Sequence, residues 1–254
     1  MLRPIHAFIG FACAIVIALC SLGCVAFGSP SADIVDRVAQ LAQRLTSEAR
    51  DRDSGIVDVP EYSGEMSVQV NGNVPYFADA DFARGTSTEF SQLDVYGRCG
   101  RAMALIGPET MPDEPRGSIG MIKPSGWHTI RYDWVDGGYL YNRCHLIAYQ
   151  LTGENANPLN LITGTRSMNV LGMQPYEDEV ASYVRTTKNH VLYRVTPIFE
   201  SDNLVASGVL MEAQSIEDNG VGVRFCVWCY NVESGVVIDY ATGESAPTDC
   251  GKTS

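Results

Sequence analysis

One histidine and a group of side-chain amides make the stretch 139–169, YLYNRCHLIAYQLTGENANPLNLITGTRSMN, the part of this sequence most suited to chemistry. The imidazole of His145 titrates near neutral pH, so its neutral form can take a proton from an attacking water. Asn169 precedes a helix-like run, where its amide is either an N-terminal cap or a neutral oxygen ligand for a hard cation such as Mg²⁺. Such a cation can clamp a phosphate oxygen and stabilise the leaving alkoxide. These parts together predict hydrolysis of a phosphodiester.

The other amides and histidines of the chain have simpler interpretations. Asn155 and Asn157 lie in a turn-rich segment, and we expect them to shape the loop. His128 and His190 fall at the starts of strand-like runs and are expected to be structural.

Two segments carry a resemblance to a known family. NRCHLIAYQLTGEN, followed by NPLNLITGTRSMN, resembles the DNA/RNA non-specific endonuclease family, the ββα-metal nucleases that include the DNA-entry nucleases of competent bacteria. The signature of that family is Asp-Arg-Gly-His, an Asn in a PxN segment, an Asn that opens the metal-bearing helix, and a Glu one to two turns later. The similarity extends from about residue 57 to residue 245.

The resemblance implies a role for each matching residue. His145 takes the place of the general base, Asn169 that of the metal ligand and Asn160 that of the supporting Asn. Glu177 takes the place of the helix Glu, which helps to hold the water shell of the metal. Arg143 takes the place of the family Arg and either contacts the substrate or supports the loop.

The implied activity is metal-dependent cleavage of DNA without sequence preference, with RNA as a second expected substrate. The resemblance implies one Mg²⁺, for which Mn²⁺ can substitute, and products with 5′-phosphate and 3′-hydroxyl ends. Arg166 lies inside the motif and is expected to bind substrate. The alternative is a catalytically inactive protein on the same fold that binds nucleic acid or the cell envelope. No protein partner can be deduced.

Two positions depart from the family signature. Asn142 replaces the Asp, which removes a negative charge, and Cys144 replaces the Gly. One explanation for Cys144 is a disulfide with Cys99 that braces the strand, and the other is a free buried thiol. A Cys–His hydrolase is a weaker interpretation, because side chains of adjacent strand residues such as Cys144 and His145 point to opposite faces.

The remaining cysteines do not predict a metal centre. The CxxC of Cys226 and Cys229 lies in a strand-like run, so the two sulfur atoms should point to opposite faces. Zinc would require a second pair of ligands, which the chain does not offer at suitable spacing. Both residues are therefore expected to behave as buried small hydrophobes.

The net charge and residues 1–30 indicate where the protein is located relative to the cell. The formal net charge is −12 and the pI is about 4.7, which disfavours broad adhesion to nucleic acid or anionic membranes while allowing a locally basic cleft. Residues 1–30 combine Arg3 with a long apolar run, and read as a signal peptide, a lipoprotein leader or a retained N-terminal membrane anchor. Each alternative predicts an extracellular or cell-surface protein, tethered to the membrane in the last two cases.

The elements that must position the site follow from hydrophobic periodicity. Residues 31–56 predict an amphipathic helix and a linker. The resemblance implies that residues 57–245 are the endonuclease domain, which leaves residues 246–254 as a C-terminal tail. Within the domain we expect a hairpin around Asn71-Gly72, a short strand at 127–132, a helix over 176–186 and a strand-rich C-terminal half. The predicted class is α+β, with an antiparallel β-sheet core, a ββα-metal motif and flanking helices.

Overall fold

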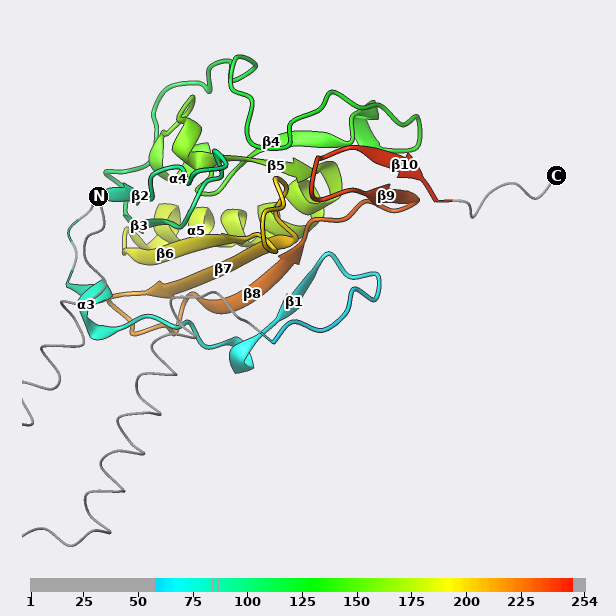
Figure 1. Ribbon diagram of the computed structural model, residues 1–254. Helices are drawn as coiled ribbons and strands as arrows, with labels where there is room; N and C mark the ends of the chain where they lie inside the picture. Colours follow the sequence, from blue (N-terminus) through cyan, green and yellow to red (C-terminus); the bar gives the residue numbers. More distant parts are fainter. Residues whose placement is uncertain (1–57, 84, 86, 249–254) are drawn as a thin grey trace, which may run out of the picture. The chain divides into compact units, whose positions relative to one another are not determined.

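A six-stranded antiparallel sheet forms the centre of the structure, a computed structural model that describes residues 58–83, 85 and 87–248 (Figure 1). The predicted leader at 1–30, the amphipathic helix and linker at 31–56, and the end of the predicted tail lie outside the described residues. Within the described part, no helix is long and apolar enough to cross a membrane. The strand order is β1-β8-β7-β6-β3-β2. Its strands are β1 (Ser67–Gln69), β2 (Thr88–Phe90), β3 (Ala102–Ile106), β6 (Val191–Ile198), β7 (Gly208–Ser215) and β8 (Arg224–Tyr230).

The two faces of this sheet bury different side chains, as the period-2 pattern of its strands requires. On β6, Val191, Tyr193 and Val195 face the larger core, which is covered by helix α5 (Gln174–Thr187). The CxxC residues separate as expected, because Cys229 belongs to this larger core and Cys226 to the smaller core on the opposite face.

The smaller core lies under the N-terminal part of the described chain, which also carries the short helix α3 (Asp79–Phe82). There the buried guanidinium of Arg194 donates to both oxygens of Glu212 at 2.6 and 2.7 Å. Glu212 also accepts the Tyr76 backbone N–H at 2.7 Å, and the ring of Phe77 lies under the Arg194 guanidinium, 4.8 Å from its centroid. A buried ion pair with additional hydrogen bonds therefore ties this segment to the sheet.

A second, two-stranded antiparallel sheet carries the His145 motif. It consists of β4 (Tyr141–His145) and β5 (Leu161–Thr165), which are separated by α4 (Tyr149–Thr152) and the 3₁₀ turn η3 (Pro158–Asn160). The π-helical segment η4 (Met168–Met173) follows β5 and continues directly into α5. Two strands and a helix in this order are the expected ββα arrangement, and α5 lies between the large sheet and the β4–β5 pair (Figure 1).

Two local predictions were wrong. No hairpin forms around Asn71-Gly72, where a 3₁₀ turn, η1 (Asn71–Asn73), follows β1 instead. β1 pairs with β8, and the chain after the turn crosses the sheet face, because Tyr76 and Phe77 engage the buried ion pair. Residues 127–132 form no strand, since only Arg131 pairs there, in an isolated antiparallel bridge with Tyr139.

The C-terminal half is strand-rich as predicted, and helix α5 contains the expected 176–186 segment. α5 ends where Lys188 takes a left-handed conformation with φ of 65°. A third sheet consists of β9 (Val236–Ile238) and β10 (Ser245–Pro247). The loop between these strands contacts β4, because Tyr141 Oη donates to Gly243 O. β10 extends two residues beyond the domain boundary predicted at 245, because its backbone is paired with β9.

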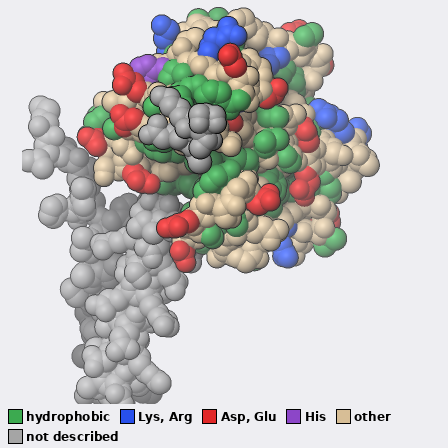
Figure 2. All heavy atoms as spheres, turned by 90° about the vertical axis from the view of Figure 1, so that its right-hand side faces the viewer, with side chains coloured by type: hydrophobic (Ala, Val, Ile, Leu, Met, Phe, Trp, Pro, Cys, Tyr) green, Lys and Arg blue, Asp and Glu red, His purple; other side chains and the backbone are tan. Residues whose placement is uncertain are grey.

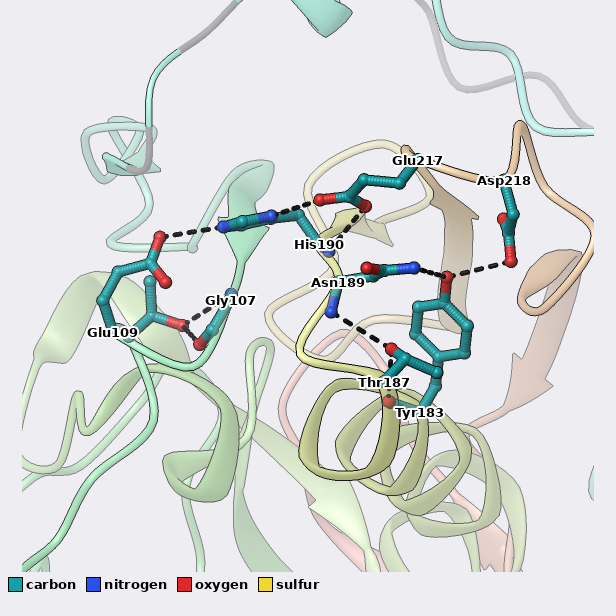
Figure 3. A network of polar contacts seen from close by, with 9 residues as sticks. Gly107, Glu109, Tyr183, Thr187, Asn189, His190, Glu217 and Asp218 are labelled. Atoms are coloured by element: carbon teal, nitrogen blue, oxygen red, sulfur yellow. Dashed lines mark hydrogen bonds and ion pairs between the residues drawn. The ribbon is translucent and has the colours of Figure 1, made fainter.

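A polar network fastens the end of α5 and the start of β6 to neighbouring loops (Figure 3). The His190 ring lies between two carboxylates, with Nδ1 2.6 Å from Glu217 and Nε2 3.1 Å from Glu109. Asn189 donates to Tyr183 Oη, which donates in turn to Asp218. The expectation that His190 is structural agrees with this position.

Candidate active site

A cavity of about 670 Å³ opens beside the β4–β5 pair and the first turns of the following helix. Its lining includes His145, Arg143, Asn169, Glu177 and Arg166, five of the six site residues predicted from the sequence. The sixth, Asn160, is fully buried and does not line the cavity. The fold thus brings together residues that are up to 34 positions apart in the chain.

The imidazole of His145 lines the cavity and is held through one of its ring nitrogens. Nε2 lies 2.8 Å from the backbone oxygen of Asn155. A carbonyl oxygen can only accept, so Nε2 carries the proton of this bond and Nδ1 keeps a free lone pair in the neutral ring. Burial lowers the pKa of His145, with a smaller contribution in the same direction from the charge of Arg116. The neutral, proton-accepting form is therefore favoured at neutral pH.

Asn160 fixes the backbone that follows His145. Its Oδ1 accepts the Ile147 N–H and its Nδ2 donates to the Ile147 carbonyl, both at 2.9 Å. Its own backbone oxygen accepts the Leu146 N–H at 2.9 Å. Asn160 therefore positions the strand end that carries His145 and does not line the cavity.

Asn169 projects from the first turn of the helical segment. Glu233 anchors this turn, since its carboxylate accepts the Ser167 N–H at 3.0 Å and the Ser167 hydroxyl at 2.6 Å. Within the described part of the chain, no hydrogen bond engages the Asn169 side-chain amide, which lines the cavity. The wide π-helical turn around it is a local geometry that is frequent at functional sites.

Glu177 follows eight residues later and lines the same cavity. Burial raises the pKa of its carboxyl to about 8, the charge of Asp178 raises it further, and Arg116 opposes both. No group of three or more His, Cys, Asp or Glu residues suited to a metal occurs in the described ranges. The available donors, a free amide oxygen and one carboxylate, fit a cation that keeps most of its waters, as Mg²⁺ does.

Positive charge is concentrated in this cavity although the chain as a whole is acidic. Arg116, Arg143 and Arg166 line it, against the single carboxylate of Glu177. Acidic side chains are instead scattered over the surface, as on the face in Figure 2. A cleft lined by one sign of charge focuses potential and attracts polyanions, so the local balance favours a phosphate-containing ligand.

The family model for DNA/RNA non-specific endonuclease matches residues 80–217, more than half of the chain. The chain belongs to the DNA/RNA non-specific endonuclease family. NucA from Streptococcus agalactiae, solved with a magnesium ion bound, matches this endonuclease with a TM-score of 0.65 and 27% identity, over 75% of this chain and 91% of that chain. The Sda1 nuclease with bound zinc matches with a TM-score of 0.57 and 30% identity, over 64% and 81% of the two chains. A further structure described as an extracellular endonuclease shares the fold, with a TM-score of 0.51 at 19% identity.

Arg143 supports a loop of the endonuclease. Its Nε and Nη2 donate to the backbone oxygens of Ile122 and Gly120, at 2.5 and 2.9 Å. Its guanidinium also lies 3.9 Å from the centroid of the Trp127 ring. Of the two alternatives for Arg143, substrate contact or loop support, the geometry favours support of the cavity wall at 120–127.

Arg166 stands at the rim of the cavity, held by Asp136. Its Nε and Nη2 both donate to one Asp136 carboxylate oxygen, at 3.0 and 2.8 Å. About a third of the Arg166 side chain is exposed, and the pair is open to water. Arg166 can therefore exchange this partner for a phosphate.

The two departures from the family signature have different consequences. Asn142 lines the cavity as a neutral residue. Cys144 points the opposite way, into the larger core, where a Cβ built on Gly164 would lie 2.5 Å from its sulfur. The absence of a side chain at Gly164 thus leaves room for the Cys144 sulfur. Burial raises the pKa of the Cys144 thiol, and its position across the strand from His145 excludes a Cys–His catalytic pair.

The proposed disulfide between Cys99 and Cys144 is wrong, because both thiols are free and buried. Cys99 Sγ donates to the backbone oxygens of Pro158 and Leu161, at 3.1 and 3.2 Å. The two sulfurs have different neighbours, so the strand is braced by packing against Gly164 and by the loop contacts of Cys99.

Several cavity residues had no recognisable signal in the sequence. Arg116 lies in a Pro- and Gly-rich loop outside the motif, and Trp127 and Tyr139 belong to segments interpreted as strand or turn. Asn155, expected only to shape the loop, orients His145 through its backbone oxygen. A contact made by backbone leaves no mark in residue types, so spacing alone could not reveal it.

Proposed function

We propose that the protein is an exported Mg²⁺-dependent endonuclease that hydrolyses DNA and RNA without sequence preference. His145 serves as the general base and Asn169 as the protein ligand of one metal ion. The observation that carries this proposal is the orientation of His145, whose Nε2–H is bonded to Asn155 O while Nδ1 remains free in a cationic cavity.

The chain's own groups account for the proton transfer and the charge. Nδ1 of His145 takes a proton from the attacking water, and the carbonyl of Asn155 stabilises the imidazolium through the Nε2–H bond. Arg116 and Arg166, which line the cavity, balance the charge that builds on the phosphate oxygens. Asn160 keeps the imidazole in place by holding the backbone at Ile147.

Asn169 would hold the metal through its side-chain oxygen, and Glu177 would accept hydrogen bonds from the metal's waters. When bound, the ion supplies Lewis-acid stabilisation of the leaving oxygen. Support comes from the free Asn169 amide and from the magnesium and zinc ions named in the NucA and Sda1 structures. Mn²⁺, with a similar preference for oxygen ligands, is expected to replace Mg²⁺.

We expect both DNA and RNA to be substrates, because both carry the phosphates that the cavity contacts. Contacts to phosphate hold no sequence information, so no sequence preference is expected. Export rests on the sequence of residues 1–30, which predicts a cleaved leader or a membrane tether.

Digestion of plasmid DNA and of RNA, with Mg²⁺ and with EDTA, tests the proposal. Wild type should cut both substrates with Mg²⁺ and neither with EDTA, and His145→Ala should lose activity while keeping the wild-type unfolding temperature. His128→Ala is a matched control, because His128 also bonds a backbone oxygen, that of Thr242, but does not line the cavity.

Equal rates for His145→Ala and wild type would contradict the mechanism. A wild type that binds oligonucleotides but cuts nothing with Mg²⁺ or Mn²⁺ would instead favour the alternative, an inactive nucleic-acid-binding protein on this fold.

A further inference from the structure

Tyr139 is an exposed aromatic residue on the rim of the cavity that contains His145. It lines the cavity and 43% of its surface is exposed, which is a large fraction for an aromatic side chain. No other aromatic ring among the described residues stacks on it. An exposed ring with no aromatic neighbour stacked on it therefore lies on the rim of the cavity that His145 lines.

The backbone holds Tyr139 in a defined place. Gly137 and Gly138 have φ of 72° and 74°, a left-handed conformation that makes a tight turn immediately before Tyr139. The antiparallel bridge between Arg131 and Tyr139 and the Leu140 N–H bond to Ile130 O then close this loop. The ring stands on a constrained support, so little ordering is required when it binds a partner.

Arg131 adds a cation to the same surface. Its guanidinium lies 4.6 Å from the centroid of the Tyr139 ring, and Nη1 donates to Tyr139 Oη at 3.4 Å. Within the described residues, Arg131 forms no ion pair with a carboxylate, so its charge is available to a phosphate. A cation on an aromatic ring is a combination that binds the base and backbone of a single strand.

The other aromatic–arginine pair of the cavity is different in kind. The Arg143 guanidinium on Trp127 uses its N–H groups to hold Gly120 and Ile122, which makes that pair a fixed wall. Of these two pairs, Tyr139–Arg131 has an exposed ring and a guanidinium that forms no ion pair within the described part of the chain.

We propose that Tyr139 and Arg131 form a stacking site for an unpaired nucleobase of the substrate, adjacent to the phosphate that is cleaved. This inference rests on the proposed function. A base inside a duplex already stacks on its neighbours and cannot offer its face to Tyr139. The site therefore gives the endonuclease a preference for single-stranded segments of DNA or RNA, without a preference for sequence.

Steady-state kinetics of the full chain with Mg²⁺ on a fluorescent single-stranded oligonucleotide and on the matching duplex test this site. Tyr139→Ala should raise KM for the single strand about 5- to 10-fold, the low end of the loss expected for one stacked base. The ratio of single-strand to duplex kcat/KM should fall by a similar factor. Tyr139→Phe, which keeps the ring, should restore both values.

Tyr96→Ala is a matched control. Tyr96 is 50% exposed and carries the guanidinium of Arg98 at 4.8 Å, but it does not line the cavity. This variant should retain the wild-type ratio. Tyr139→Leu, which preserves bulk without a π face, provides a second test if Tyr139→Ala fails to fold, and should show the same rise in KM.

Fluorescence anisotropy of the single strand in EDTA separates this inference from the proposed function. Weaker binding by Tyr139→Ala than by wild type would support the stacking site even if wild type cut nothing. An unchanged single-strand KM and unchanged binding in Tyr139→Ala, or a Tyr139→Phe variant as defective as Tyr139→Ala, would overturn it.

Discussion

Replacing Asn160 with alanine should both destabilise the protein and impair its chemistry. The substitution removes two hydrogen bonds of 2.9 Å and leaves the N–H and the carbonyl of Ile147 without their partner. Asn160 is fully buried, so each unpaired group costs about 1–3 kcal/mol. The loss of unfolding free energy should therefore be about 2–6 kcal/mol, which lowers Tm by roughly 4–24 °C in a protein of this size.

The effect on catalysis follows from the same bonds. Ile147 is two residues after His145, and a looser backbone there displaces the imidazole from its bond with Asn155 O. A displacement of about 1 Å can cost on the order of 100-fold in rate. We expect kcat to fall at least about tenfold, with a smaller change in KM.

Urea unfolding followed by tryptophan fluorescence, together with digestion kinetics at 15 °C, measures both effects. Asn157→Ala is the control from the same loop, since it removes a partly exposed cap of Leu159 N–H and a 3.3 Å bond to Glu154, and should cost about 1 kcal/mol. Asn160→Asp, which keeps the acceptor for Ile147 N–H but loses the donor to Ile147 O, should fall between wild type and Asn160→Ala. The reasoning is refuted if Asn160→Ala unfolds at the same urea concentration as wild type.

Three further predictions concern groups away from the cavity. Glu212→Gln removes the nearer of the two carboxylates around the buried Arg194 guanidinium and leaves Asp81 at 3.6 Å, so it should cost about 1.5–3 kcal/mol by urea unfolding; a loss below 1 kcal/mol would contradict this. The hydrogen bond to Glu217 raises the pKa of His190 in the folded protein. The extra stability of wild type over His190→Gln should therefore have its full value between about pH 5 and 6.5 and be lost as pH rises through the folded pKa. Thermal unfolding of both proteins from pH 5 to 9 checks this, and a stability difference that grows with pH would be contrary to it. Burial raises the pKa of Cys99 to about 11, so iodoacetamide at pH 8 should modify this thiol only in urea, as mass spectrometry of its peptide can establish.

Several features of the fold and of the site could be predicted from the sequence. Residue type and order in the segment 142–177 were sufficient to predict the endonuclease family, the ββα arrangement and the cavity positions of His145, Asn169 and Glu177. Strand alternation predicted an antiparallel sheet, and the apolar face of 176–186 predicted the helix on it. These features depend on local periodicity and on side-chain chemistry, which are both visible in a linear sequence.

Contacts between distant segments were decided only by the tertiary structure. The hairpin expected at Asn71-Gly72 does not form, because the segment after the turn binds Glu212 and Arg194 on another part of the sheet. Cys99 and Cys144 had plausible chemistry for a disulfide, yet the fold directs each sulfur to different neighbours.

For His145 and Arg143, the sequence predicted a residue of the site and the tertiary structure decided its contacts. The residue type of His145 and its motif were enough to predict it as the general base. Which of its nitrogens holds the proton depends on the backbone oxygen of Asn155, and the role of Arg143 depends on the oxygens of Gly120 and Ile122. Every residue has a backbone carbonyl, so only the path of the folded chain selects the one that each side chain meets.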